Sequence, residues 1–153
     1  MDQWYANEQR TTFEGIKKYQ QATYYAGQWE PRYDKWVAMQ AGMYTGNGKQ
    51  AVMWNQALTS DMILSQPVVH EIEKIRVPTL LLIGEQDNTA IGKAAAPAEV
   101  QKTLGNYKVL GAETARTIPG AKLVAFEDLG HSPQIQAPDR FNKELLDGLQ
   151  AMK

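Results

Sequence analysis

Two short apolar runs, residues 77–83 and 123–126, constrain the fold of this 153-residue chain more than any other feature. Short, continuous runs of this kind are typical of strands that are buried on both faces of a sheet. A helical pattern of apolar residues lies between the two runs, and another begins at Pro138, since proline is favoured at the first position of a helix. The order strand, helix, strand, helix predicts a parallel α/β sheet.

The predicted sheet is too small to form a core of its own. Two strands cannot bury both of their faces, so we expect partner strands to come from elsewhere. The alanine-rich segment between Asn88 and Asn106 is long for a loop in a compact domain, and we predict that it contains a short helix over residues 98–104. The chain therefore reads as one part of a larger α/β core.

Aromatic side chains are concentrated at the start of the chain. Of the 14 (3 Phe, 4 Trp and 7 Tyr), 11 precede residue 55. Apolar residues recur there at helical spacing, and turn residues such as Ala26-Gly27 interrupt them. We therefore predict three or four short helices over residues 1–66, distinct from an α/β region over residues 67–153. We expect most of the aromatic side chains to form the core of the first region, and a few to line an apolar pocket.

The composition excludes several classes of partner and chemistry. With 16 basic and 17 acidic residues and no basic cluster, the chain has no feature that favours nucleic acid or an anionic membrane surface. No apolar run approaches the roughly 18 residues of a membrane span. The absence of cysteine excludes disulfides, thiolate catalysis and cysteine-ligated metals. We expect no cofactor and no metal. The compartment stays open, cytoplasmic or exported, although residues 1–5 lack the pattern of a signal peptide.

Asp87 and His131 are the candidate catalytic residues, and each follows a predicted strand. Ligands of open parallel sheets bind beyond the carboxyl ends of the strands, so we expect both side chains at one rim of the sheet. A carboxylate that accepts a hydrogen bond from one imidazole nitrogen orients the ring. It also stabilises the imidazolium that forms when the other nitrogen takes a proton. This pattern predicts His131 as a general base and Asp87 as the acid that orients it.

Three other residues compete for functional roles. Asp128 is close to His131 in sequence, but its position before Gly130 is typical of a turn-stabilising residue. Ser132 adjoins the predicted base, which is a poor arrangement for a nucleophile. His70 has no metal-ligating partner at helical spacing, so we expect it on the surface.

The segments VPTLLLIGEQD and AKLVAFEDLGHSPQIQAPDRF resemble the C-terminal half of the α/β-hydrolase family. The resemblance spans essentially the whole chain, because residues 1–66 are similar to the helical cap that this family inserts ahead of its last strands. It implies that Asp87 and His131 are the acid and base of a Ser-His-Asp triad. Gln136 stands where many relatives carry glutamate, a departure that leaves the triad untouched and is expected to alter a local hydrogen bond.

The nucleophile of that family is missing from this chain. It sits in a Gly-x-Ser-x-Gly turn between a strand and a helix. Ser60, Ser65 and Ser132 all lack the flanking glycines. We therefore expect the nucleophile in a missing N-terminal half of the same protein, and we expect this chain alone, a fragment, to be inactive.

The resemblance implies hydrolysis of a small, apolar, ester-like substrate by the longer parent protein. One alternative keeps the fold but uses an aspartate nucleophile, as haloalkane dehalogenases and epoxide hydrolases do. Another is a non-catalytic fragment that only binds a partner or forms a homodimer through an open sheet edge.

Overall fold

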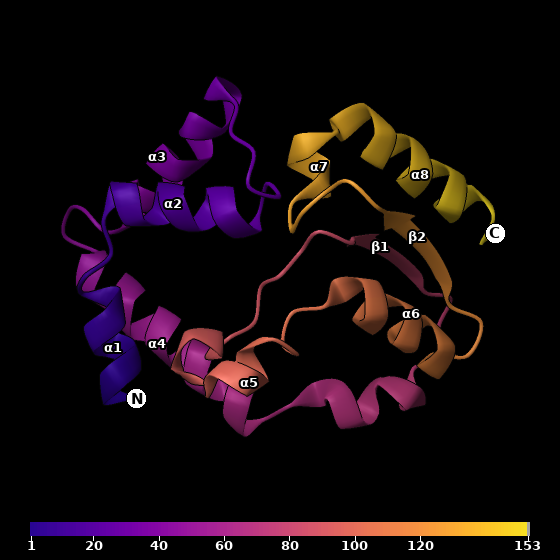
Figure 1. Cartoon of the computed structure of the whole chain (residues 1–153), viewed down its shortest axis with the longest axis horizontal. Coiled ribbons are helices and arrows are strands. Elements are labelled where there is room, and N and C mark those ends of the chain that lie inside the picture. The colour runs from indigo at the N-terminus through magenta and orange to yellow at the C-terminus, as the bar shows by residue number, and fades with distance from the viewer. Residues whose placement is uncertain (153) are drawn as a thin grey trace. The chain divides into compact units, whose positions relative to one another are not determined.

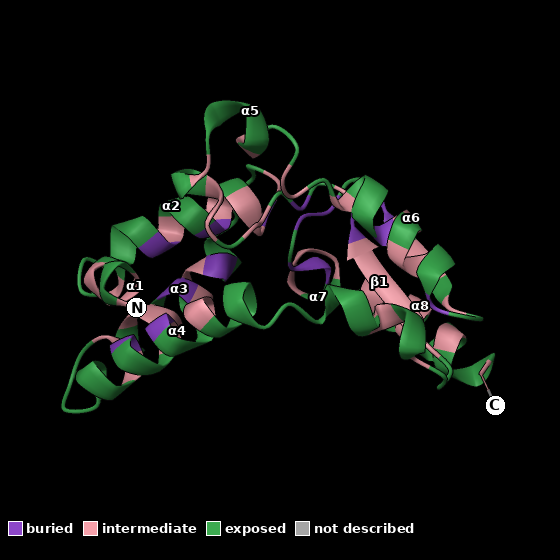
Figure 2. Ribbon diagram, turned by 90° about the horizontal axis from the view of Figure 1, so that it is seen from below, coloured by how far each residue is buried: buried purple, intermediate pink, exposed green. Residues whose placement is uncertain are grey.

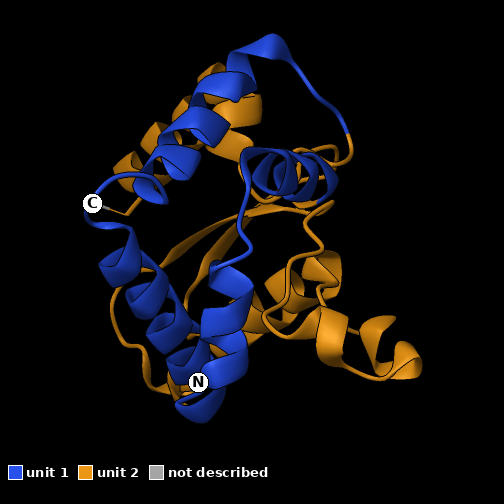
Figure 3. Cartoon of the chain, turned by 90° about the vertical axis from the view of Figure 1, so that its left-hand side faces the viewer, with its two compact units in different colours: residues 1–22, 28–67 blue, residues 23–27, 68–153 orange. Residues whose placement is uncertain are grey.

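The computed structural model describes residues 1–152, which form two compact units. Unit 1 contains residues 1–22 and 28–67, and unit 2 contains residues 23–27 together with the residues from Val68 onward (Figure 3). A short segment of the aromatic region therefore belongs to the same compact unit as the two strands.

Unit 1 is helical (Figure 1). Its elements are α1 (Asp2–Glu8), α2 (Phe13–Thr23, whose last residue lies in unit 2), the 3-10 helix η1 (Pro31–Tyr33), α3 (Asp34–Met43) and α4 (Lys49–Ser65). Pro31 opens η1, and the left-handed Gly46 (φ 74°) lies in the turn between α3 and α4. This agrees with the helices that the spacing of the apolar residues predicts.

The core of unit 1 uses few of its aromatic residues. Tyr33 is 1% exposed and packs edge-on against the Trp29 ring, with centroids 5.7 Å apart. In contrast, Tyr19 and Trp54 are about half exposed, so the expectation that most aromatic side chains are core residues is wrong for these two. A unit this small has too little interior volume to enclose so many large rings.

Unit 2 contains a parallel two-stranded sheet. The strand β1 (Leu80–Gly84) pairs with β2 (Lys122–Phe126) in the register Leu82 to Val124. The other elements of unit 2 are η2 (Val68–Lys74), η3 (Lys93–Ala95), α5 (Ala98–Gln101), α6 (Tyr107–Thr117), α7 (Pro133–Gln136) and α8 (Pro138–Gln150). The fold is thus mixed α/β. Both described strands overlap the apolar runs that predict them, although β1 begins at Leu80 rather than at Val77.

Helices α6 and α8 cover opposite faces of β1, as Figure 2 shows. Gly111 of α6 lies against the side chain of Ile83, and Gly148 of α8 lies against Leu80. Side chains three positions apart on a strand point to opposite faces, so these two contacts fix one helix on each side. The rings of Phe126 and Phe141, 6.1 Å apart, also join β2 to α8.

Two predictions about unit 2 need correction. The strands are only partly buried, and Gly84 and Phe126 are their only fully buried residues. Within residues 1–152 each strand has one neighbour and one open edge, so the sheet lacks the flanking strands that would enclose it. The helix expected over residues 98–104 ends at Gln101, because the chain turns towards the left-handed Gly105 (φ 72°), which packs on the backbone of Asn88.

No helix within residues 1–152 combines the length and the apolar character needed to cross a membrane.

Candidate active site

The loops that leave β1 and β2 are joined by backbone contacts. The N–H of Glu85 donates to the carbonyl of Phe126 at 2.9 Å, and the N–H of Gln86 donates to the carbonyl of Leu129 at 2.9 Å. Parallel strands end at the same edge of a sheet, so these two hydrogen bonds continue the pairing of the strands into the loops that follow them. The two loops therefore lie side by side as far as the candidate residues.

Asp87 and His131 are in contact where these two hydrogen-bonded loops continue. Oδ2 of Asp87 lies 2.7 Å from Nδ1 of His131. The second carboxylate oxygen, Oδ1, accepts the backbone N–H of Thr89 at 2.8 Å. Because a carboxylate faces Nδ1 of the neutral ring, Nδ1 carries the hydrogen and Nε2 is left as the proton acceptor. The structure thus brings the two predicted residues into the contact that a base and its orienting acid need.

The two side chains differ sharply in exposure. The side chain of Asp87 is 6% exposed, whereas that of His131 is 42% exposed. The carboxylate is therefore held inside the protein with both oxygens hydrogen-bonded, and the imidazole remains accessible to a reactant.

Thr89 makes a second contact with the histidine. Its Oγ1 lies 3.3 Å from Nδ1 of His131 and 3.4 Å from the hydroxyl of Tyr107, at the start of α6. The threonine therefore contacts the pair through both its backbone and its hydroxyl. The sequence offered no local signal for this role, since a threonine after a strand is common in turns.

Gln136 fixes the turn that carries His131. Its Oε1 accepts the backbone N–H of Gly130 at 2.7 Å, and Gly130 is buried. Sequence reasoning expected a local hydrogen bond at this position without its partner, and the structure supplies the partner. Ser132, next to the histidine, is 4% exposed and its backbone N–H donates to the carbonyl of Tyr24 at 3.2 Å.

Tyr24 lies directly against the candidate base. Its ring centroid is 4.6 Å from that of the His131 imidazole, and the two planes are inclined by 38°. Sequence reasoning assigned no role to Tyr24, and nothing local could have revealed it, because more than a hundred positions separate the two residues in the chain.

Asp128 and His70, the other candidates for functional roles, do not take part in the Asp87–His131 contact. Asp128 accepts a hydrogen bond from Nη1 of Arg140 at 2.7 Å, and this hydrogen bond lowers the pKa of the aspartate. His70 is exposed in η2, as expected. Within residues 1–152, no group of three or more His, Asp or Glu side chains is placed to hold a metal ion.

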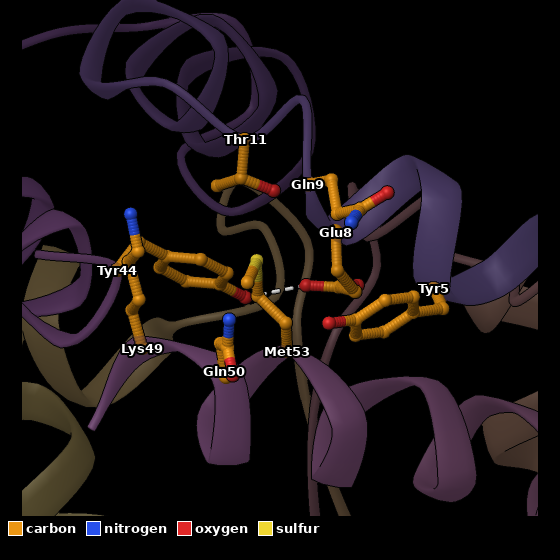
Figure 4. Close-up of a pocket in the computed structure, with 8 residues that line it drawn as sticks. All are labelled: Tyr5, Glu8, Gln9, Thr11, Tyr44, Lys49, Gln50 and Met53. Carbon is orange, nitrogen blue, oxygen red and sulfur yellow. Dashed lines mark hydrogen bonds between the residues drawn. The ribbon is translucent and has the colours of Figure 1, made fainter. Parts of the chain in front are cut away.

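A hollow of about 290 Å³ lies in unit 1, lined by polar side chains of α1 and α4 and by Tyr44 (Figure 4). The hydroxyl of Tyr44 donates to Oε2 of Glu8 at 2.6 Å, which is the dashed line in Figure 4. Burial, together with the Glu8 carboxylate, raises the pKa of Tyr44 to about 12. This hollow contains neither Asp87 nor His131, and it is polar, unlike the apolar pocket that the aromatic content predicts.

Comparisons with known proteins identify one informative similarity. No family model and no curated protein matches the chain. A crystal structure of a probable hydrolytic enzyme from Pseudomonas aeruginosa is similar to it, with 63% sequence identity and a TM-score of 0.94. The similarity covers 97% of this chain and 47% of the other. The chain thus spans about half the length of a probable hydrolytic enzyme, and it has the fold of that part.

Proposed function

We propose that this chain is the C-terminal part of an α/β-hydrolase and supplies the acid and the base of its Ser-His-Asp triad. The observation that carries the proposal is the 2.7 Å contact between Asp87 and His131 at the carboxyl ends of two parallel strands. The similarity to a probable hydrolytic enzyme supports it. That enzyme is about twice as long as the chain, which leaves room for further strands and for a nucleophile.

The proposed reaction is the hydrolysis of a carboxylic ester. A serine of the missing part attacks the carbonyl carbon while its proton passes to Nε2 of His131. Asp87 stabilises the imidazolium through Nδ1, and His131 then returns the proton to the departing alcohol. In the second half, His131 takes a proton from water as the water attacks the acyl-enzyme, and the serine leaves with that proton. General base work of this kind contributes about 10²–10⁴-fold to the rate.

The buried carboxylate suits this role. Asp87 accepts one hydrogen bond from Thr89 and one from His131, so its negative charge is fixed beside Nδ1 rather than solvated. The carboxylate is already in place when the imidazolium forms, so no rearrangement is needed. A preorganised charge of this kind stabilises the charge that develops during the reaction. The exposed imidazole leaves Nε2 open to the nucleophile.

We extend the proposal to the division of the chain. Residues 1–66 would be a helical cap and residues 67–153 part of the hydrolase core. The apolar, ester-like character of the substrate rests on the aromatic composition of residues 1–66 alone, since the hollow that the structure shows in unit 1 is polar.

The experiment uses the longer protein that contains this chain, assayed on an activated ester such as a nitrophenyl ester. The Asp87→Asn variant is expected to lose about 10⁴-fold in kcat, as the loss of an orienting carboxylate typically does, and His131→Ala to lose activity at least as severely. Asp128→Asn is the matched control, because it removes a neighbouring carboxylate that contacts Arg140 instead. An active His131→Ala variant would refute the proposal.

The isolated chain provides a second test. We expect no esterase turnover from residues 1–153 alone, because no serine of the chain lies in a nucleophile turn. Turnover that a serine-directed covalent inhibitor abolishes would contradict this expectation. An aspartate found at the nucleophile position of the longer protein would instead support the dehalogenase or epoxide-hydrolase alternative.

A further inference from the structure

We propose that Tyr24 is a positioning residue for His131: its ring packs on one face of the imidazole and fixes the plane in which Nε2 exchanges its proton. The inference rests on the proposed function, because positioning matters only if His131 acts as a base. It assigns a part in the reaction to a residue that precedes both strands and lies outside the Asp–His pair.

The backbone of residues 23–27 is anchored to the histidine loop. The N–H of His131 donates to the carbonyl of Thr23 at 3.4 Å, and the N–H of Ser132 donates to that of Tyr24 at 3.2 Å. Between these bonds, Gly130 lies so close that a Cβ atom on it would be 2.6 Å from the Tyr24 carbonyl oxygen and 2.9 Å from the nitrogen of Ala26. The segment and the loop are therefore in direct backbone contact on both sides of Tyr24.

The chain conformation after Tyr24 is unusual. Ala26 has φ 54° and Gly27 has φ 79°, so two consecutive residues directly after Tyr25 have positive φ. Alanine adopts this region at an energetic cost, and such residues persist where the surroundings fix them. The contacts with Gly130 provide those surroundings. Tyr25, which is fully buried, packs edge-on against Tyr24 with centroids 6.4 Å apart.

The aromatic contact supplies what the hydrogen bond to Asp87 lacks. Asp87 and Thr89 both contact the same atom, Nδ1, so they fix the direction of that nitrogen but do not restrict the tilt of the ring plane. A ring 4.6 Å away, inclined by 38°, restricts that tilt. The negative face of an aromatic ring also attracts a cation, so the contact strengthens when His131 becomes charged. Both effects favour the orientation that proton transfer requires.

The first test is made by NMR on the longer protein that contains this chain, and it needs no turnover. The wild type should show nuclear Overhauser effects between the ring protons of Tyr24 and those of His131, and the His131 protons should carry a ring-current shift. Tyr24→Leu should abolish the shift, whereas Tyr24→Phe should keep it. Tyr19→Leu is the control, since Tyr19 is a half-exposed tyrosine of unit 1. Absence of the Overhauser effects in the wild type would overturn the proposal even if the leucine variant fails to fold.

The second test is kinetic and uses the longer protein. Displacement of a catalytic group by about 1 Å can cost about 10²-fold in rate, so we expect Tyr24→Leu to lower kcat by up to that factor with little change in KM. Tyr24→Phe should restore kcat. A rise in KM at unchanged kcat would overturn the proposal, because it would mean that Tyr24 contacts substrate instead. The two proposals fail separately, since an active His131→Ala variant refutes the triad while the NMR contact stands.

Discussion

Gly84 and Gly130 touch through their backbones: a Cβ atom on Gly84 would overlap the carbonyl oxygen of Gly130. Gly84 ends β1, and Gly130 directly precedes His131. The separation of the two loops is therefore set by main-chain contact, and no side chain can be inserted there without moving them. The short distance between Asp87 and His131 depends on this contact.

We predict that Gly84→Ala destabilises the protein and disturbs the Asp87–His131 pair. The added methyl group would meet fixed backbone atoms, and overpacking of this kind typically costs about 1–3 kcal/mol. Gly42→Ala is the matched control, because Gly42 lies in α3 and an added Cβ would meet no atom within 4 Å apart from its chain neighbours and the backbone of its own helix. That substitution should stabilise by about 0.5–1 kcal/mol. Urea denaturation of both variants measures the difference, and an unchanged Gly84→Ala midpoint would contradict the prediction.

Gln136 is predicted to act as an acceptor for the histidine turn. Gln136→Met keeps the size of the side chain but leaves the buried N–H of Gly130 without this acceptor, which should cost about 1–3 kcal/mol. Gln136→Glu retains a side-chain oxygen and should remain close to the wild type. Thermal denaturation of the two variants measures the contribution of this hydrogen bond to stability. Equal losses for both would show that the hydrogen bond is unimportant.

The hydroxyl of Thr89 should contribute modestly to activity. Thr89→Val retains the backbone N–H to Asp87 but removes the hydroxyl near His131 and Tyr107. The loss of one such contact is worth about 0.5–1.5 kcal/mol, so kcat of the longer protein should fall by about two- to tenfold. Thr89→Ser should recover most of the loss. A valine variant with full activity would assign Thr89 a purely backbone role.

Tyr44 should ionise later than an ordinary tyrosine. Burial and the nearby Glu8 carboxylate disfavour the phenolate, so the pKa of Tyr44 is raised from 10.0 to about 12. Because the folded value exceeds the unfolded one, this group's contribution to stability is complete below pH 10 and is lost as the pH rises through about 12. An ultraviolet phenolate titration should lose a step near pH 12 in Tyr44→Phe. A variant that titrates like the wild type would contradict the assignment.

The sequence predicts the elements that determine the candidate site. The apolar runs identify β1 and β2, and Pro138 marks the first residue of α8. The position of Asp87 and His131 after successive parallel strands predicts that they lie at one rim, and the structure places them in contact. Periodicity and strand ends are local features, so they can be recognised without a structure. The catalytic role of the pair stays a prediction.

The parts that sequence reasoning missed depend on contacts between distant segments. Tyr24 looks like any aromatic residue at the end of a helix, and only the tertiary structure brings it to His131. Gly84 looks like a turn glycine, yet its role is to let another backbone approach. The partial exposure of the strands likewise depends on which neighbours the sheet has.

Asp87 and His131 differ in exposure, so reagents in solution reach the pair from the histidine side. Both oxygens of the buried Asp87 carboxylate accept hydrogen bonds, whereas the His131 imidazole is 42% exposed, so the imidazole is the more accessible side of the pair. Any electrophilic reagent that modifies imidazoles should therefore disable the pair from the histidine side and leave the carboxylate chemically intact. Whatever occupies the space in front of Nε2, whether water, a substrate or another polypeptide segment, controls both the charge state and the reactivity of the site.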